Sequence, residues 1–599
     1  MADGYTLAVF VLIFNFGKEI FMKNWFKYIR PYLPYFLLGP LCMIVEVIGE
    51  VMMPRLLSLV INSGTAETLT VSKSITTAIL MIIVAVVMML GGVGGAYYGA
   101  KASVNFAADL REDIYKKVQS YSFKNIDKFS TGSLVTRLTN DVTQLQNFVN
   151  MLLRMALRAP GMMLGGLIMA ILLKPSLSVI FAVTIPLMVL TVAGIILFGF
   201  KRFVKMQSKI DNLNSTVQES VTNVRVVKSF VREDFENKKF QRSNAELKNA
   251  GMSAMRLMIF MQPVTTIFMN ITTLCVLWFG SDMVAGHEME IGDLSAFITY
   301  VTQILSSLMM ITMLLMTSAR ALASARRIKE VLNEEVDIKD LIDADVGLKV
   351  EKGKIEFKNV SFRYYEQSDS PVLDKINLTI EAGQTVGFIG STGCGKTTLV
   401  SMIPRLYDPD EGQVLVDGVN VKNYTLFNLR EGVSMVLQKN VLFSGTIAEN
   451  LRWGNENATD EEITAASQRA QADKFVSTFK DGYDTDLGQG GSNVSGGQKQ
   501  RLCIARALLK LPKILILDDS TSAVDTATEK QIRNALKDEL PKTTKLIIAQ
   551  RISSVESADM IVVMDNGRIT GVGTHEELLK HNEEYKEIYY SQNEKKEAE

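Results

Sequence analysis

A glycine-rich run with one lysine and one threonine could bind the phosphate groups of a nucleotide. It follows the apolar residues 385–389, which we predict as a buried strand, and it leads into a predicted helix that begins at Lys396. In that context the glycines let backbone amides close around phosphates, Lys396 neutralises phosphate oxygens and Thr397 can ligate magnesium. The predicted phosphate-binding residues are Gly390, Ser391, Thr392, Gly393, Cys394, Gly395, Lys396, Thr397 and Thr398.

Two further segments carry chemistry that complements a bound phosphate. The apolar residues 514–517 end in Asp518, a carboxylate suited to magnesium, and Asp519 follows it as a candidate general base. Ser495 stands at the start of a predicted helix whose amides and positive dipole end can grip a phosphate. This serine–glycine signature comprises Ser495, Gly496, Gly497 and Gln498.

Composition separates the chain into an apolar part and an ordinary α/β part. The 599 residues are 47% hydrophobic, and the apolar residues crowd into roughly the first 320 positions. Basic and acidic residues balance at 64 each, so nothing indicates a nucleic-acid partner. The 4 cysteines lie far apart in the sequence, which predicts no disulfide framework.

Six stretches of the apolar part are long enough to cross a membrane as helices. About 20 apolar residues span the hydrocarbon core. Four of these stretches lack any charged residue over a span-length run, whereas the first contains Glu46, Glu50 and Arg55. The predicted spans are about 34–62, 74–101, 150–173, 175–200, 257–281 and 294–319.

Basic residues predict the orientation of these spans. The connection 201–255 is dense in lysine and arginine, whereas residues 281–293 contain neither. The positive-inside rule therefore predicts both termini, and the long connections 102–148 and 201–255, on the cytoplasmic side. Apolar periodicity and few glycines or prolines predict that these connections are helical extensions that fold back in pairs.

The domain organisation follows from these patterns. Residues 5–16 are apolar but too short to span a membrane, so they are either an interfacial segment or sit upstream of a true start at Met22. The predicted parts are an N-terminal segment with an elbow helix (1–33), a transmembrane domain (34–332), a linker (333–353), a nucleotide-binding domain (354–590) and a charged tail (591–599).

Two carboxylates stand one helical turn apart in the first span. Glu46 and Glu50 are costly at membrane depth, so they are expected to face a cavity or a partner. One interpretation is a cavity for a cationic or polar substrate. The other is pairing within the bundle, for instance with Arg55, or with a partner chain.

Together these motifs resemble an ATP-binding cassette (ABC) exporter half-transporter. The resemblance covers the chain from about residue 22 and implies an all-α six-helix membrane bundle fused to an α/β P-loop domain with an antiparallel β subdomain. It implies ATP and Mg²⁺ as ligands, with Tyr364 stacking on adenine, Gln438 contacting magnesium and the attacking water, and Asp518 coordinating magnesium beside Thr397. In this family two cassettes pair head to tail, so each ATP lies between one chain's phosphate loop and the other chain's signature.

The chain departs from this family at two catalytic positions. Asp519 stands where the family has a glutamate base, and Gln550 stands where it has a histidine that senses the γ-phosphate. A general base must reach its proton at about 2.6–3.2 Å, so a side chain one methylene shorter slows the step. Gln550 cannot change charge near neutral pH. These departures predict a site that holds ATP and rarely cleaves it.

The resulting hypothesis is one subunit of a heterodimeric exporter. A homologous half-transporter would supply the hydrolysing phosphate loop, and this chain would supply Ser495 to it. Two alternatives stay open: a homodimeric exporter with a slow ATPase that uses Asp519, and a nucleotide-gated regulator or channel. The resemblance loosely favours export of small hydrophobic or amphipathic compounds, drugs or lipids, across a bacterial or archaeal cell membrane.

Overall fold

The chain folds into two compact units, each described here by itself. We name the first, formed by residues up to Lys117 together with Gly132–Asn333, the membrane unit, and the second, Val118–Thr131 with Glu334–Glu599, the cassette unit. The expectations for residues 5–16 and for a start at Met22 fall outside the described part of the chain. The computed structural model describes residues 23–65, 71–342, 344–364, 370–520 and 524–597.

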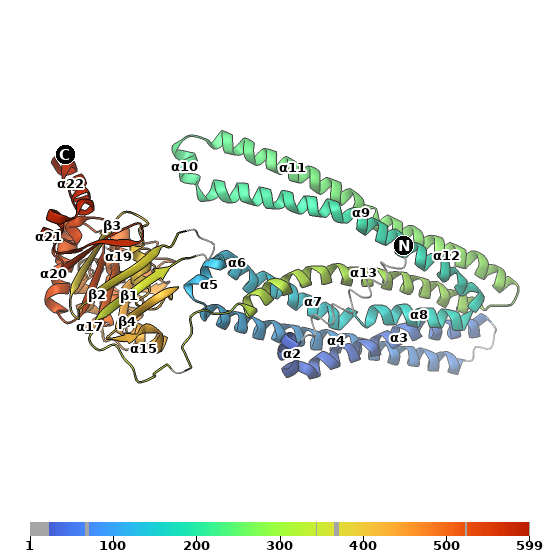
Figure 1. The fold of residues 1–599 in the computed structure, drawn as a ribbon. Helices are drawn as coiled ribbons and strands as arrows, with labels where there is room; N and C mark the ends of the chain where they lie inside the picture. The colour runs from blue at the N-terminus through green and yellow to red at the C-terminus, as the bar shows by residue number, and fades with distance from the viewer. Residues whose placement is uncertain (1–22, 66–70, 343, 365–369, 521–523, 598–599) are drawn as a thin grey trace. The chain divides into compact units, whose positions relative to one another are not determined.

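Long helices build the membrane unit (Figure 1). Within the described residues, six helical segments are long and apolar enough to cross a membrane. Their main helices are α3 (Leu33–Thr65), α4 (Val71–Gln119), α7 (Val142–Met155) continued by α8 (Arg158–Leu173), α9 (Pro175–Thr222), α11 (Glu233–Ile259) continued by α12 (Met261–Ala285), and α13 (Ile291–Asn333).

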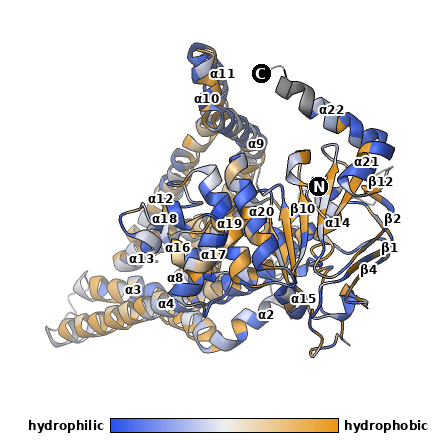
Figure 2. Cartoon of the chain, turned by 90° about the vertical axis from the view of Figure 1, so that its left-hand side faces the viewer, coloured by the Kyte–Doolittle hydropathy of each residue, from blue (hydrophilic) through white to orange (hydrophobic). Residues whose placement is uncertain are grey.

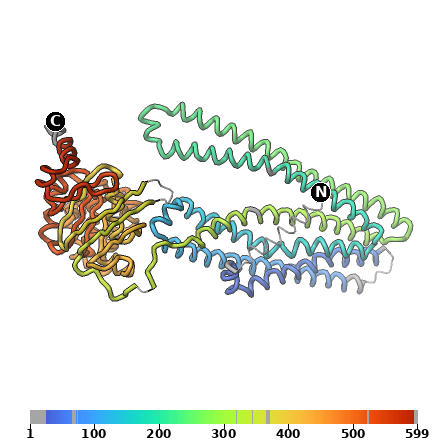
Figure 3. The backbone as a smooth tube through the Cα atoms, in the orientation of Figure 1, coloured from blue at the N-terminus to red at the C-terminus, as the bar shows by residue number. Residues whose placement is uncertain are grey.

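One of the two long connections is a helical hairpin. The helix α9 turns through the short helix α10 (Val224–Ser229) into α11, and α9 and α11 run side by side (Figure 3). Hydrophobic residues prevail along α3, whereas α10 and α11 carry many hydrophilic ones (Figure 2). Since a helix rich in hydrophilic residues gains little from lipid, this change in composition agrees with helices that extend beyond the apolar spans.

Small residues let the membrane helices approach closely. A Cβ atom on Gly165 of α8 would lie 2.9 Å from Cγ2 of Val51 in α3, and one on Gly166 would lie 3.1 Å from Cγ1 of Ile304 in α13. Helix pairs in membranes are held mainly by such close packing, because lipid offers no hydrophobic drive for association. Tyr300 of α13 is buried in this core and donates a hydrogen bond of 2.9 Å to the Val51 carbonyl.

Two sheets form the framework of the cassette unit. The first is antiparallel, in the order β2-β1-β4-β5, and the second has the order β12-β11-β3-β10-β9-β6, with every pair parallel except β11 with β12. The strands are β1 (Ile355–Phe362), β2 (Leu373–Ile380), β3 (Thr385–Gly390), β4 (Glu411–Val416), β5 (Val419–Asn420), β6 (Val433–Val436), β9 (Ile514–Asp518), β10 (Thr544–Ile548), β11 (Met560–Asp565) and β12 (Arg568–Gly573).

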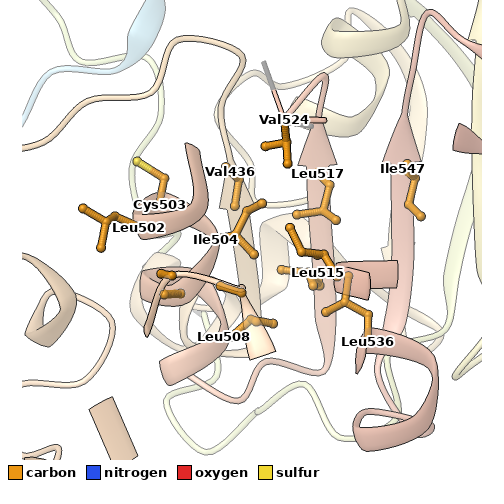
Figure 4. Packing of buried hydrophobic residues seen from close by; sticks show 14 of the residues in the cluster. Val436, Leu502, Cys503, Ile504, Leu508, Leu515, Leu517, Val524, Leu536 and Ile547 are labelled. Atoms are coloured by element: carbon orange, nitrogen blue, oxygen red, sulfur yellow. The ribbon is translucent and has the colours of Figure 1, made fainter. Parts of the chain in front are cut away.

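Helices cover the parallel sheet and complete a dry core. The helices α19 (Gly496–Leu509) and α20 (Thr526–Glu539) contribute Ile504, Leu508 and Leu536, which pack against Leu515 and Leu517 of β9 (Figure 4). All five side chains are at most 2% exposed. This continuous apolar contact fixes where α19, and hence its N-terminus, lies within the unit.

The predicted fold class is therefore confirmed: an all-α membrane bundle is fused to a P-loop α/β domain with an antiparallel β subdomain. The cassette unit also includes the helix α5 (Phe123–Lys128), which lies in the long connection after α4. Its Asp127 accepts a hydrogen bond of 3.2 Å from the Tyr407 hydroxyl, and the ring of Phe123 lies 6.0 Å from the Tyr407 ring. A segment that follows a membrane helix thus folds with the nucleotide-binding domain.

Candidate nucleotide-binding site

The carboxyl ends of adjacent parallel strands bring the predicted site residues together. The order β3-β10-β9-β6 places the phosphate loop after β3, Gln550 just after β10, Asp518 and Asp519 at the end of β9, and Gln438 just after β6. Ligands bind at this edge of open α/β sheets because loops and helix N-termini converge there. Four segments far apart in sequence thus meet at one site.

Glycine is required at two bends of the phosphate loop. Gly390 has φ 150° and Gly395 has φ 98°, and a Cβ atom on Gly390 would lie 1.9 Å from the carbonyl oxygen of Met564. Gly395 is the N-cap of α14 (Lys396–Ser401). The loop therefore curves tightly between strand and helix, and its backbone amides are available to an anion.

Lys396 lies across this curved loop. Its Nζ donates hydrogen bonds of 2.9 Å to the Gly390 carbonyl and 2.8 Å to the Ser391 carbonyl, and lies 3.4 Å from the Cys394 sulfur. These contacts hold the ammonium group where it can neutralise phosphate oxygens of a nucleotide bound in the loop. Cys394 is buried, whereas Ser391, Thr392 and Gly393 are exposed.

The residues around Asp518 fit a magnesium ion. Thr397 Oγ1 donates a hydrogen bond of 2.9 Å to Asp518 Oδ1, while the other carboxylate oxygen, Oδ2, is buried and has no hydrogen-bond partner in the described structure. Burial raises the pKa of the Asp518 carboxyl, and the charge of Asp519 adds to this effect. A buried carboxylate oxygen without a donor is costly, and a cation satisfies it.

Thr397, Asp518 and Gln438 would hold magnesium, which when bound would neutralise charge on the β- and γ-phosphate oxygens. Gln438 lies near enough to hydrogen-bond the neighbouring Asp519 carboxylate. With magnesium bound, these residues would bind and orient a triphosphate, and removal of a proton from water would be left to Asp519.

Asp519 is held by neighbours on both sides. Gln550 Nε2 donates a hydrogen bond of 2.9 Å to Asp519 Oδ2, and the Asp519 amide donates one of 3.0 Å to the Ile548 carbonyl. The residue has a left-handed φ of 45°. Burial raises the pKa of the Asp519 carboxyl above its ordinary value, although hydrogen bonds from Gln438 and Gln550 act in the opposite direction. The Asp519 carboxylate is thus hydrogen-bonded by the neutral amide of Gln550, which carries no positive charge.

Tyr364 belongs to an aromatic cluster beside the phosphate loop. Its hydroxyl lies 2.9 Å from Thr398 Oγ1, and its ring meets the rings of Phe362 and Tyr407 edge to face at 5.0 and 5.3 Å. The ring remains half-buried. Tyr407 therefore contacts both Tyr364 and the helix α5, a link that the sequence analysis did not find because it joins residues from separate segments.

The signature forms a capping box at the start of α19. The Gln498 amide donates to Ser495 Oγ at 3.3 Å, and the Ser495 amide donates to Gln498 Oε1 at 2.9 Å. Gly496 and Gly497 form the first helical positions. Ser495 and Gly496 are exposed, so the amides at this helix start are accessible to a phosphate group from outside the chain.

A further contact links the signature helix to the catalytic position. Gln500 Nε2, from the first turns of α19, donates a hydrogen bond of 3.3 Å to the Asp519 carbonyl. Gln500 is 1% exposed. The sequence carried no signal for this residue, since its role depends on how α19 packs against the end of β9.

In the membrane unit, Glu46 and Glu50 pair within the bundle. Arg158 at the start of α8 lies 3.2 Å from Glu46 through Nη1 and 3.2 Å from Glu50 through Nη2. Arg55, the partner considered from the sequence, instead pairs with Asp293 at 2.6 Å. Arg158 could have been found from sequence, because it is a charged residue inside the predicted span 150–173 and falls under the same cost argument as the two glutamates.

Comparisons with known proteins agree with this geometry. Residues 36–308 match the family model of the ABC transporter transmembrane region, and residues 373–522 match the family model described as ABC transporter. The chain is 37% identical over 95% of its length to YfiB of Bacillus subtilis, an uncharacterized ABC transporter ATP-binding protein, and covers 98% of it. It is 32% identical to the ATP-dependent lipid A-core flippase of Syntrophus aciditrophicus, covering 96% of this chain and 95% of that protein.

A solved structure shares the fold over nearly the whole chain. The structure of a bacterial Atm1-family ABC exporter with ATP bound matches with a TM-score of 0.77, 24% identity, and coverage of 94% of this chain and 98% of that one. Fold and site together define an ATP-hydrolysing membrane transporter. The chain belongs to the ABC transporter family and has the half-transporter architecture of its exporters, with one membrane domain followed by one nucleotide-binding domain.

Proposed function

We propose that this chain is the subunit of a heterodimeric ABC exporter that binds ATP durably at its own phosphate loop and supplies its signature to the partner's hydrolysing site. The observation that carries the proposal is the engagement of the short Asp519 carboxylate by Gln550 at 2.9 Å. A homologous half-transporter is the partner, and ATP with Mg²⁺ is the ligand set.

The chemistry of the two catalytic positions supports a slow site. Asp519 keeps the charge of a base, but its side chain is one methylene shorter than glutamate and is tied to an amide. Gln550 offers a hydrogen bond without the positive charge that would stabilise a γ-phosphate in the transition state. Lys396, Thr397 and Asp518 retain the apparatus for binding.

The signature supports a role in the neighbouring site. Ser495 and its capping box form the start of α19, a helix of 14 residues. The buried apolar face of α19 holds this helix against the core of the cassette unit. Nothing in this geometry impairs phosphate binding by the α19 N-terminus. The proposed division of labour therefore assigns binding to this chain's loop and catalysis to the partner's loop completed by Ser495.

Two variants of the assembled transporter test this proposal. Asp519→Asn removes the candidate base of the slow site and should change the ATPase rate of the pair less than about twofold, because that site contributes little turnover. Ser495→Ala removes a donor from the fast site and should lower the rate by about 10²-fold or more, the usual cost of losing a transition-state donor. Equal losses in the two variants would favour a homodimeric exporter that uses Asp519.

The purified chain alone provides the second measurement. The heterodimer proposal predicts weak ATPase activity for the purified chain alone and strong activity for the chain with its partner. Rapid ATP hydrolysis by the chain alone would contradict the proposal. Transport without hydrolysis would favour the alternative of a nucleotide-gated channel.

For the cargo, we propose hydrophobic or amphipathic compounds, drugs or lipids, in a bacterial or archaeal cell membrane with both termini in the cytoplasm. The similarity to a lipid A-core flippase supports a lipid-like cargo. The dense lysine and arginine of the long connections support the orientation. A transport assay with a fluorescent lipid and a drug panel tests the substrate class.

A further inference from the structure

A cavity in the membrane unit is lined by two arginines. Its volume is about 350 Å³, within the usual range for a small-molecule site. It lies against the helices α7, α8 and α13, and its polar lining consists of two guanidinium groups and two side-chain amides. The lining residues are Asn147, Asn150, Met151, Arg154, Met155, Arg158 and Met310.

In the proposed orientation the cavity lies toward the cytoplasmic end of the spans. At 1.5 Å per residue, Arg158 stands about 22 Å from Leu173 at the far end of α8, and Met310 stands about 28 Å from Ile291 at the corresponding end of α13. A hydrocarbon core is about 30 Å thick. In the proposed orientation the cavity therefore lies in the cytoplasmic half of the hydrocarbon layer, within reach of the headgroups of that leaflet.

Charge around the cavity favours an anion. Both carboxylates near it, Glu46 and Glu50, are engaged by Arg158, and no carboxylate lines the cavity itself. Arg154 is exposed and makes no ion pair within the described residues. An unpaired guanidinium at membrane depth repels a cation and is costly unless an anion or water satisfies it.

The neighbouring groups complete a site for an amphiphile. The side-chain carbons of Arg154 run past Gly99 of α4, where a Cβ atom would lie 3.4 Å from Arg154 Cγ, so the absence of a side chain there gives the arginine room. Asn147 and Asn150 add amide donors, and Asn150 also reaches Ser103 Oγ at 3.4 Å. Met151, Met155 and Met310 offer flexible apolar contacts to a chain.

We propose that Arg154, supported by Arg158, binds the anionic phosphate or carboxylate head of an amphiphile entering from the cytoplasmic leaflet. This rests on the proposed export function and narrows its substrate class. Because Arg158 pairs with Glu46 and Glu50, we favour an anionic head over the cationic or polar substrate that was one of the two interpretations of those carboxylates. The planar guanidinium fork suits phosphate and carboxylate oxygens, with which it forms paired hydrogen bonds.

Binding to the full chain in nanodiscs of zwitterionic lipid tests this proposal. The probes are dodecyl phosphate, dodecyltrimethylammonium and inorganic phosphate, each titrated without ATP. We expect dodecyl phosphate to bind and the other two to bind at least about tenfold more weakly. Equal binding of the cationic amphiphile would overturn the proposal, and equal binding of inorganic phosphate would show a free-anion site without a lipid role.

Variants assign the binding to this cavity. Arg154→Gln should weaken dodecyl phosphate binding about tenfold, whereas Arg154→Lys should retain part of it, since a lysine keeps the charge but not the fork. Arg256→Gln is the matched control, because Arg256 is exposed near the start of α12 and does not line the cavity. Arg158 is left intact, because its removal would leave two buried carboxylates unpaired. Unchanged binding by Arg154→Gln would refute the site.

The result of the dodecyl phosphate titration does not depend on whether the transporter is a heterodimer. Binding without ATP requires neither the partner nor Asp519, so anion selectivity can persist even if the ATPase asymmetry is absent. Conversely, the ATPase rates of the Asp519→Asn and Ser495→Ala variants can differ clearly while the chain shows no preference for the anionic amphiphile. That pair of results would overturn the anionic substrate class and leave the heterodimer proposal standing.

Discussion

At the scale of single residues, Asp519 and Gln550 act as a unit. The amide of Gln550 contacts the carboxylate of Asp519, and the main chain of Asp519 is fixed by Ile548 and by Gln500. The backbone at Asp519 is hydrogen-bonded on both sides, so the proposed slow hydrolysis is assigned to the side chains of Asp519 and Gln550. Substitutions at these two positions should therefore raise the rate of ATP hydrolysis at this site.

Restoring the longer base and the histidine should raise hydrolysis at this site. Asp519→Glu combined with Gln550→His returns the methylene that brings a base into reach and a side chain that can carry positive charge. We expect single-turnover ATP hydrolysis by the chain to rise by about 10-fold or more, within the range that general-base catalysis contributes. Asp519→Asn with Gln550→His is the control, and a similar increase there would show that the carboxylate is not the base.

At the scale of elements, close helix packing depends on small residues. A Cβ atom at Gly165 would lie 2.9 Å from Val51, whose branched side chain has little freedom to move. Among the described residues, no atom other than those of its own stretch of helix backbone lies within 4 Å of the Cβ position of Gly194 in α9. The two glycines therefore differ in their tolerance for an added methyl group.

Gly165→Ala should destabilise the membrane unit, and Gly194→Ala should not. The expected cost of overpacking is about 1–3 kcal/mol, whereas alanine at Gly194 favours the helix slightly. Thermal unfolding of the two variants in the same detergent measures the difference. Equal unfolding temperatures would mean that α3 and α8 separate more easily than their packing indicates.

The helix α5 and the nucleotide site share the side chain of Tyr407. This ring contacts Phe123 of α5 and Tyr364 beside the phosphate loop, and its hydroxyl binds Asp127. A change at Tyr364, the residue proposed to stack on adenine, can therefore reach the segment that follows α4. These contacts of Tyr407 show coupling between α5 and the nucleotide site only if a variant that removes them changes the response to a ligand.

Tyr407→Ala should uncouple substrate from ATP hydrolysis in the assembled transporter. Ring contacts of this kind contribute about 0.5–1.5 kcal/mol each, so we expect substrate stimulation of the ATPase to fall while basal activity is largely kept. Tyr407→Phe retains the ring and should keep most of the stimulation. Full stimulation in the alanine variant would show that α5 communicates through other contacts.

At the scale of the whole molecule, we predict the orientation in the membrane from the distribution of charge. The connection α9–α10–α11 is rich in lysine and arginine, whereas the turn between α12 and α13 has none. In a variant without native cysteines, a cysteine at His287 should react with a membrane-impermeant thiol reagent added outside intact cells. A cysteine at Asn582 should react only after the membrane is opened. The reverse pattern would contradict the proposed orientation.

Short contiguous patterns in the sequence were enough to predict the fold class and the motifs of this protein. The spans, the phosphate loop, the signature and the aspartates after the apolar strand are each encoded within a short segment, because one helix or one strand–loop–helix turn is a local structure. The fold class and the family followed from them, and the structure and the comparisons confirmed both.

Tertiary structure alone decided which of these segments meet. The pairing of Glu46 and Glu50 with Arg158, rather than of either with Arg55, joins α3 to α8. The contact of Gln500 with Asp519 depends on how α19 packs on β9, and the link from Tyr364 to α5 depends on Tyr407. Each is a contact between segments distant in sequence, whose geometry depends on the packing of the whole unit, so no local pattern could predict it.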